Sequence, residues 1–232
     1  MITIVSTRVT DVLQDEAGRI IETRPGGPAY YIERVFQKAD IPYQLVTGQE
    51  MTVKIVSVPG KDQVGKVQDY GLRQKIPKVD TPHLLVSTLY EEWDLDPLSG
   101  YGGNLFLDVQ GFVRNPQVGY GRKKKWAPPF GLVPLFVKTN FAELAYIPAE
   151  FAEDQRRRGL IVTHDRFGSE IYWQGRREII PTGELVETND TLGAGDTYFA
   201  RFTIEFLNTG DPIRAARQAA VQARQLLEER NK

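Results

Sequence analysis

The sequence predicts an α/β fold in which a doubly wound, mostly parallel central sheet is flanked by helices. Short apolar runs alternate along the chain with segments of helical periodicity, which is the pattern of βαβ units. Several of these runs, such as residues 84–87 and 105–108, are apolar almost throughout, as expected of strands that are buried on both faces. The length of 232 residues suits one large domain, so residues 1–232 are treated as a single unit.

The first half of the chain contains short strand signals and one long helix. The turn-like residues 15–18 separate two strand-like segments and predict a hairpin. The break at residues 25–28 places Pro28 near the first turn of a helix, a position that proline favours. The expected strands are 2–5, 11–13, 19–23, 43–46, 53–58, 84–87 and 105–108; the expected helix is 28–38, and a turn is expected at 59–62.

The second half alternates strands with helices and ends in two helices. Residues 169–173 and 176–180 predict a second hairpin about Gln174 and Gly175. Asp211 followed by Pro212 is an N-cap with proline at the first helical position. Residues 109–134 are rich in glycine and proline and predict a long loop. The remaining expectations are strands at 135–137 and 159–163 and helices at 140–146, 150–158 and 198–207.

Composition excludes several classes of function. The formal net charge of −1 gives no overall attraction to nucleic acid or to an anionic membrane. The absence of cysteine excludes disulfides and thiolate metal sites and fits a reducing compartment. No apolar run is long enough to span a bilayer, and the N-terminus lacks the features of a signal peptide. We therefore expect a cytoplasmic protein without a membrane partner.

The most informative segment is Asp-Thr-Leu-Gly-Ala-Gly-Asp at residues 190–196, just ahead of a helical pattern. Backbone N–H groups at a helix N-terminus bind anions, and glycine and alanine allow a phosphate to approach closely. A carboxylate at Asp196 would repel a phosphate but is well placed to take the proton of an attacking hydroxyl. The segment predicts a phosphoryl-transfer site, with Asp196 as the base. The alternative is a glycine-rich turn in which Asp196 only caps the helix.

Other catalytic patterns are missing from the sequence. It has no Gly-x-x-x-x-Gly-Lys-Ser/Thr loop, so a P-loop kinase is unsupported. It has no Gly-x-Ser-x-Gly elbow, which removes the commonest hydrolase interpretation. His83 and His164 lie far apart and lack carboxylates at metal-ligand spacing, so a zinc site is not expected.

Residues 190–199 resemble the C-terminal signature of the ribokinase-like (PfkB-type) carbohydrate and nucleoside kinases. Three weaker segments follow the order of that family. Gly26-Gly27 before a helix resembles its N-terminal glycine pair, residues 138–143 resemble its Asn-x-x-Glu motif, and residues 162–168 resemble the strand and turn before the nucleotide loop. The resemblance spans most of the chain and implies ATP-dependent phosphorylation of a hydroxyl on a small sugar, polyol or nucleoside. Residues 108–114 resemble those of members that act on inositol or related polyols.

The resemblance also implies a role for each matching residue. Asp196 would be the catalytic base, and the amides of Gly193, Ala194 and Gly195 would form the anion hole. The acceptor would be bound by Asp11, Gly26 and Gly27. Lys138, Asn140, Thr163 and Gly168 would bind the nucleotide. Asn140 and Glu143 would organise Mg²⁺, and Asp190 would bind a monovalent cation such as K⁺.

Some features depart from the family pattern. Members are considerably longer, and here the lid segments near residues 11–24 and 47–60 are short, which predicts a small or vestigial β-lid. A reduced lid leaves open a catalytically inactive, kinase-like binding or regulatory protein. An open lid also exposes a sheet edge that favours a homodimer.

Three segments have simpler interpretations that stay open. The Pro-Gly-Gly-Pro run at 25–28 is a turn in most proteins. Glu143 suits an exposed first turn of a helix through the helix dipole. The basic run 122–126, which ends in Trp126, is interpreted as a solvated loop; a nucleic-acid surface is the less favoured alternative.

Overall fold

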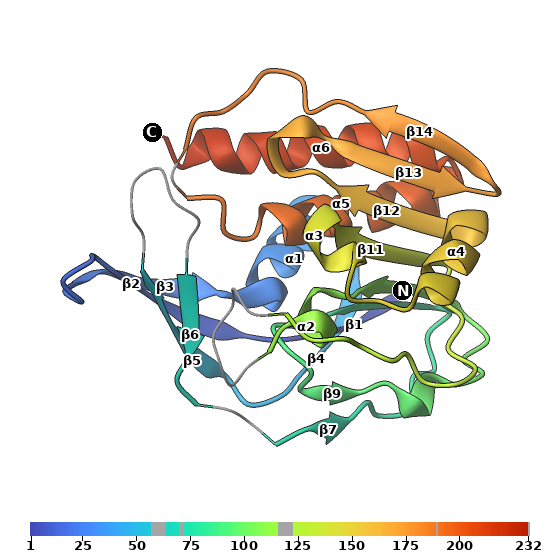
Figure 1. The fold of residues 1–232 in the computed structure, drawn as a ribbon, viewed down its shortest axis with the longest axis horizontal. Helices are drawn as coiled ribbons and strands as arrows, with labels where there is room; N and C mark the ends of the chain where they lie inside the picture. Colours follow the sequence, from blue (N-terminus) through green and yellow to red (C-terminus); the bar gives the residue numbers. More distant parts are fainter. Residues whose placement is uncertain (57–63, 70–71, 116–122, 189, 232) are drawn as a thin grey trace.

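The computed structural model describes residues 1–56, 64–69, 72–115, 123–188 and 190–231, and it shows an α/β architecture built on one large sheet (Figure 1). This central sheet has eight strands in the order β14-β13-β12-β11-β10-β8-β1-β4. The pairs from β4 to β12 are parallel, and the two pairs that add β13 and β14 are antiparallel. The predicted fold class is confirmed. The strands are β1 (Ile2–Ser6), β4 (Tyr43–Thr47), β8 (His83–Ser87), β10 (Asn104–Asp108), β11 (Phe136–Asn140), β12 (Gly159–Thr163), β13 (Ser169–Trp173) and β14 (Arg176–Ile180).

Helices cover both faces of the central sheet. Successive side chains of a strand point to opposite faces, so Leu85 packs in the core beneath α1, α5 and α6, and its neighbour Leu84 packs in the core beneath α2 and α4. The two buried clusters explain why the parallel strands are apolar at nearly every position. The helices are α1 (Gly27–Lys38), α2 (Gln110–Val113), α3 (Phe141–Leu144), α4 (Ala149–Arg158), α5 (Ala194–Thr209) and α6 (Pro212–Glu229), with short 3-10 turns at Asp96–Leu98 and Asp165–Phe167.

A second, smaller sheet, which we call the lid sheet, projects beyond the central one (Figure 1). Its four strands lie in the order β3-β2-β5-β6, and the segments predicted as lid supply β2, β3 and β5. Val9, Met51 and Val53 of the lid sheet pack against Leu89 and Tyr90, which follow β8 of the central sheet. The strands are β2 (Val9–Gln14), β3 (Ile20–Gly26), β5 (Met51–Val56) and β6 (Val64–Val67); a separate pair is formed by β7 (Gln74–Lys75) and β9 (Trp93–Asp94).

Most of the expected elements are present, with differences at their ends. β11 continues to Asn140 rather than stopping at residue 137, because it stays paired with β12 up to Asn140 and Thr163. The expected loop at 109–134 contains the short helix α2. The expected turn at 59–62 lies outside the described residues.

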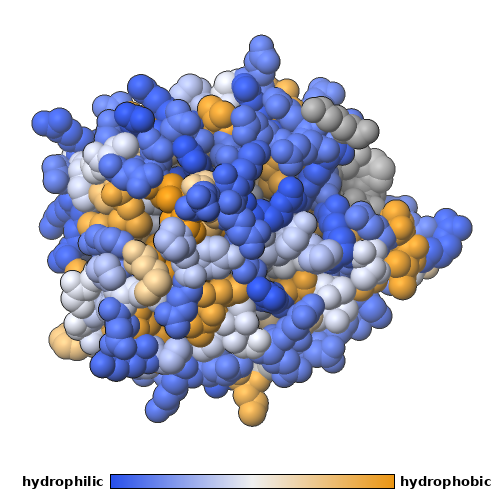
Figure 2. All heavy atoms as spheres, turned by 180° about the vertical axis from the view of Figure 1, so that it is seen from behind, coloured by the Kyte–Doolittle hydropathy of each residue, from blue (hydrophilic) through white to orange (hydrophobic). Residues whose placement is uncertain are grey.

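The surface is mixed in character. Figure 2 shows the face opposite to that of Figure 1, where hydrophobic residues are interspersed among hydrophilic ones. Within the described ranges, none of the helices combines the length and the apolar character that crossing a bilayer requires. The expected homodimer stays a prediction.

Candidate active site

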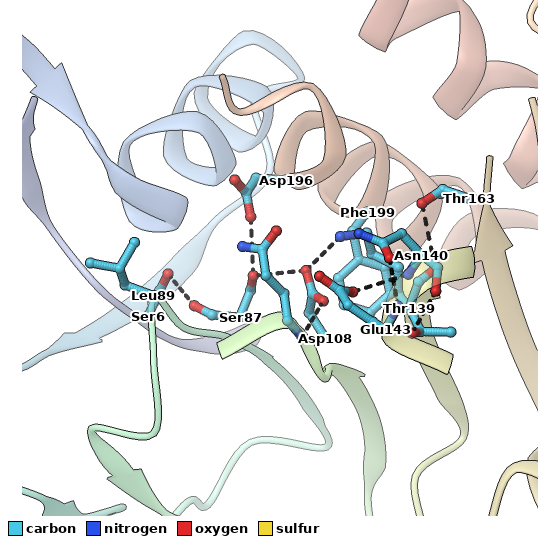
Figure 3. Close-up of polar contacts among 12 residues, drawn as sticks. Ser6, Ser87, Leu89, Asp108, Thr139, Asn140, Glu143, Thr163, Asp196 and Phe199 are labelled. Atoms are coloured by element: carbon cyan, nitrogen blue, oxygen red, sulfur yellow. Dashed lines mark hydrogen bonds and ion pairs between the residues drawn. The ribbon is translucent and has the colours of Figure 1, made fainter. Parts of the chain in front are cut away.

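The carboxyl ends of the parallel strands bring polar side chains together at one edge of the central sheet (Figure 3). Ser87, Asp108, Asn140 and Thr163 are the last residues of β8, β10, β11 and β12. Each comes at the end of a strand that is largely buried. Ligands of doubly wound sheets bind at this edge, and the N-terminus of α5 reaches the same place, because Asp196 contacts Ser87.

The glycine-rich turn is shaped to begin α5. Gly193 precedes the helix with a φ of 73°, and a Cβ atom there would lie 2.2 Å from the ring of Tyr31, so only glycine fits. The Ala194 amide donates to the carbonyl of Thr191 at 3.2 Å. This N–H is used within the turn, and the expected contribution of the Ala194 amide to an anion hole stays a prediction. The amides of Gly195 and Asp196 belong to the first turn of α5, where backbone N–H groups have no intrahelical acceptor.

Asp196 is a buried carboxylate, with 7% of the residue exposed. Its Oδ1 lies 3.2 Å from the Ser87 hydroxyl. Burial raises the pKa of Asp196, and the nearby Asp108 carboxylate raises it further, against the opposing effect of Lys138. A carboxylate whose proton affinity is raised in this way is suited to accept a proton.

Lys138 supplies a buried positive charge beneath the glycine-rich turn. Its Nζ lies 2.7 Å from Oδ2 of Asp108, and a Cβ atom on Gly195 would be 3.2 Å from the same Nζ. Burial disfavours the charged ammonium, but the carboxylates of Asp108 and Asp196 outweigh it and raise the pKa of Lys138. The ammonium group therefore stays charged and adds positive potential beside the helix N-terminus.

Asn140 and Glu143 form a capping box at the start of α3. The side chain of Asn140 accepts from the Glu143 amide at 2.8 Å, and the Glu143 carboxylate accepts from the Asn140 amide at 3.0 Å. Glu143 is 2% exposed, so its interpretation as an exposed first-turn residue is wrong. Its Oε1 lies 3.5 Å from Nζ of Lys123, so the second oxygen of the carboxylate pairs with a cation.

The expected substrate residues meet where the lid sheet joins α1. Asp11 on β2 is 3% exposed, and a Cβ atom on Gly26 would lie 1.9 Å from its Oδ2. Gly27 has a φ of 75° and lies against Val9. Both positions require glycine because a side chain there would collide with β2. The absence of a side chain at Gly26 lets the Asp11 carboxylate fit beside the start of α1. Asp15, a second carboxylate close to Asp11 in the sequence, pairs with Arg19 in the β2–β3 turn.

We expect the burial of Asp11 to be visible in the pH dependence of stability. Burial raises the pKa of Asp11 from 3.8 to about 6. The stabilising contribution of the protonated form is full below about pH 4 and is lost as the pH rises through about 6. Asn does not titrate, so the Asp11→Asn protein should not lose this contribution. The difference in unfolding free energy between Asp11→Asn and wild type should therefore shift in favour of the variant by about 2–3 kcal/mol as the pH rises from about 4 to about 7. Urea unfolding across that range measures the difference, and a difference that does not change with pH would contradict the assignment.

Asp190 is bound by two guanidinium groups. Arg24 on the lid strand β3 contacts its Oδ2, and Arg230 beyond α6 donates to its Oδ1 at 3.0 Å. Arg230 also reaches the hydroxyl of Tyr31 at 3.0 Å. The expected role of Asp190 as a ligand of a monovalent cation stays a prediction, and such a cation would have to compete with these two guanidinium groups. Asp190 joins the lid sheet, α1 and the C-terminal segment at the entrance of the glycine-rich turn.

Thr163 and Gly168 lie on the side of the site expected for the nucleotide. Thr163 ends β12, and its hydroxyl donates to the carbonyl of Thr139 at 3.4 Å. Gly168 has a φ of 102°, and a Cβ atom there would lie 2.1 Å from the carbonyl oxygen of Ile180. The geometry accounts for glycine at 168 by the tight turn into β13; contact with a nucleotide stays a prediction.

The side chains of residues 123–126, the described part of the basic run, contact other residues of this protein. Lys123 pairs with Glu143, and Lys124 with Glu91. Trp126 is 6% exposed and packs in the core against Phe112. Arg122 lies outside the described residues. The solvated-loop interpretation is thus wrong for Trp126, and the aromatic side chain that a nucleic-acid surface would present is not available for stacking.

Sequence reasoning missed Ser87 and gave Asp108 only a weak role in substrate preference. Both end apolar runs that were predicted as parallel strands, so the rule that ligands gather at carboxyl ends could have identified them. Arg24 and Arg230 had no such signal, because their partner Asp190 is distant in sequence from both.

Comparisons with known proteins support the fold. No family model matches the sequence, and no curated protein sequence matches it. Solved structures do match. The nucleoside kinase of Methanocaldococcus jannaschii, a ribokinase-family member, has a TM-score of 0.70 and 19% identity over 98% of this chain and 91% of that one. The ribokinase of Arabidopsis thaliana, complexed with ribose and ATP, has a TM-score of 0.71 and 14% identity over 96% of this chain and 90% of that one.

A third solved structure differs in its phosphoryl donor. It is a pyrophosphate-dependent kinase in the ribokinase family, complexed with a pyrophosphate analog and myo-inositol. It has a TM-score of 0.67 and 17% identity over 95% of this chain and 92% of that one. At these levels of identity the three structures establish a shared fold, and the predicted ribokinase-like fold is confirmed.

Proposed function

We propose that this chain is a kinase that transfers a phosphoryl group from ATP to a hydroxyl of a small sugar, polyol or nucleoside. The observation that carries the proposal is the buried Asp196 carboxylate in the first turn of α5, with the Lys138 ammonium beneath the same turn. A base and an anion site in one turn are what phosphoryl transfer to an alcohol requires. A helix cap needs neither a buried carboxylate nor a buried lysine.

Asp196 would act on the acceptor and the turn on the phosphate. As the acceptor hydroxyl attacks, its proton passes to the Asp196 carboxylate. The amides at Gly193 and Gly195, together with the Lys138 ammonium, would stabilise the negative charge of the transferred group. Asp11 would orient the acceptor by accepting hydrogen bonds from other hydroxyls.

Asn140 and Glu143 at the end of β11 are the residues that we propose to organise Mg²⁺. Within the described ranges, no three His, Cys, Asp or Glu side chains gather as a metal cage. Mg²⁺ is usually bound by one or two carboxylates together with phosphate oxygens and water. Because the Glu143 carboxylate already accepts from the Asn140 amide and pairs with Lys123, the two residues would act on Mg²⁺ through water. When bound, Mg²⁺ would neutralise β- and γ-phosphate oxygens. Binding of K⁺ by Asp190 stays a prediction, because it would have to displace at least one of the two guanidinium groups that contact this carboxylate.

A donor and acceptor screen tests the proposal. Purified protein with Mg²⁺ should convert ATP to ADP only when a suitable sugar, polyol or nucleoside is added. An inositol is included among the polyols because residues 108–114 resemble those of inositol kinases. A parallel series with pyrophosphate covers the second donor, because one similar structure is a pyrophosphate-dependent kinase.

The control is the Asp196→Asn protein purified in the same way, which exposes any contaminating kinase. Thermal stabilisation by ATP without turnover on any acceptor would favour the alternative, a kinase-like binding or regulatory protein. If the protein shows no turnover and does not bind ATP, the proposal is wrong.

A further inference from the structure

The hydroxyl of Ser87 lies between two carboxylates. Its Oγ is 3.2 Å from Oδ1 of Asp196 and 3.3 Å from Oδ2 of Asp108 (Figure 3). Ser87 and Asp108 are both 0% exposed. A serine hydroxyl carries one hydrogen, so Ser87 donates to only one of the two carboxylates at a time.

The backbone at Ser87 is held in place, whereas its hydroxyl is free to turn. Ser6 on β1 donates to the Ser87 carbonyl at 2.6 Å, and the two residues are paired in the parallel sheet. Asp108 has two further donors, Nζ of Lys138 at 2.7 Å and the amide of Gln110 at 3.0 Å. Asp108 therefore keeps its hydrogen bonds when Ser87 turns to Asp196.

We propose that Ser87 is a positioning residue for phosphoryl transfer, whose O–H turns between Asp196 and Asp108 as Asp196 gains and loses a proton. This inference rests on the proposed function. Before transfer, Ser87 donates to the Asp196 carboxylate and fixes its orientation. The acceptor oxygen then forms a bond to phosphorus, the bond from phosphorus to the donor's bridging oxygen breaks, and the acceptor proton moves to Asp196.

Once protonated, Asp196 is neutral and is a weaker acceptor than the Asp108 carboxylate, so the Ser87 hydroxyl turns to Asp108. Loss of the proton to solvent restores the first arrangement. Ser87 gives up no atom in this cycle. Burial has the largest effect on the pKa of Asp196 and raises it, as does the Asp108 carboxylate, whereas the charges of Lys138 and Arg114 lower it. A hydrogen bond donated to a carboxylate favours its charged form, so the bond from Ser87 also lowers the pKa of Asp196.

Removing the hydroxyl should therefore shift the pH dependence of catalysis. In Ser87→Ala, the acidic limb of kcat/KM should move to higher pH, with about a tenfold loss of kcat/KM on that limb. Thr3→Val is the matched control, because it deletes a buried hydroxyl from the neighbouring strand β1 whose hydrogen bond goes to Thr81 and not to Ser87 or to either carboxylate. Its limb should coincide with that of wild type.

A titration without turnover separates this inference from the proposed function. Carboxyl ¹³C signals of aspartate-labelled protein report the ionisation of Asp196, with Asp196→Asn identifying its signal. The midpoint should rise in Ser87→Ala and stay unchanged in Thr3→Val. If wild type transfers no phosphoryl group, the proposed function fails, and the titration alone decides the role of Ser87.

An unmoved midpoint, or an unmoved acidic limb in an active enzyme, would overturn the inference. A purely structural role would lower the unfolding free energy of Ser87→Ala and leave both pH readouts unchanged. Should Ser87→Ala fail to fold, Ser87→Cys keeps a side chain of related shape with a much weaker donor. It should shift the same midpoint upward, and no shift would again overturn the inference.

Discussion

Replacing Asp196 by Asn should lower kcat by about 10²–10⁴-fold and leave donor binding close to that of wild type. The amide keeps the shape of the side chain but cannot take the acceptor proton. Because burial disfavours the charged carboxylate of Asp196, Asn should not destabilise the fold at neutral pH. Steady-state phosphorylation and calorimetric titration with the donor measure the two effects.

The matched control for this variant is Asp211→Asn. Asp211 caps the neighbouring helix α6 by accepting from the amides of Ile213 and Arg214. Asn caps a helix about as well as Asp, so this variant should retain turnover. Equal rates for the Asp196→Asn and wild-type enzymes would show that Asp196 is not the base.

Replacing Lys138 by Met should lower the unfolding free energy by about 3–5 kcal/mol. The change leaves Asp108 and Asp196 buried without their ammonium partner, and both residues are almost completely shielded from water. Turnover should fall as well, because positive charge is lost beneath the glycine-rich turn. Urea unfolding at neutral pH measures the loss of stability.

Two further variants test whether that loss of stability comes from the buried charge of Asp108. Lys138→Met combined with Asp108→Asn should recover part of the stability, because the second change removes an uncompensated buried charge. Lys78→Met breaks a surface pair with Asp80 whose side chains are 88% and 76% exposed, and it should cost no more than about 1 kcal/mol. If Lys138→Met costs as much stability in the Asp108→Asn protein as in wild type, the two side chains are not coupled.

The sequence predicts the fold well because its signals are local. Apolar runs mark the parallel strands, the turn residues mark the hairpins, and the Asp211-Pro212 cap begins α6 as the structure has it. The segment at 190–196 is also a local signal, since glycine at 193 is demanded by a positive φ.

What the sequence does not predict depends on contacts between distant segments. The contacts of Asp190 with Arg24 and Arg230 could not be predicted, because the two arginines lie on other elements of the fold. Lys138 is predicted to bind a phosphate, and only the sheet order shows that Asp108 on the adjacent strand already pairs with it. Ser87 carries no motif, and its place beside Asp196 follows from the packing of α5 against the sheet edge.

A crystal structure with a non-hydrolysable donor analogue and an acceptor from the screen would locate both reacting groups relative to Asp196. We expect the terminal phosphate against the amides of Gly193 and Gly195. We also expect the acceptor oxygen at hydrogen-bonding distance, about 2.6–3.2 Å, from the Asp196 carboxylate. A donor phosphate bound away from this turn, or an acceptor hydroxyl that does not reach Asp196, would contradict the proposed function.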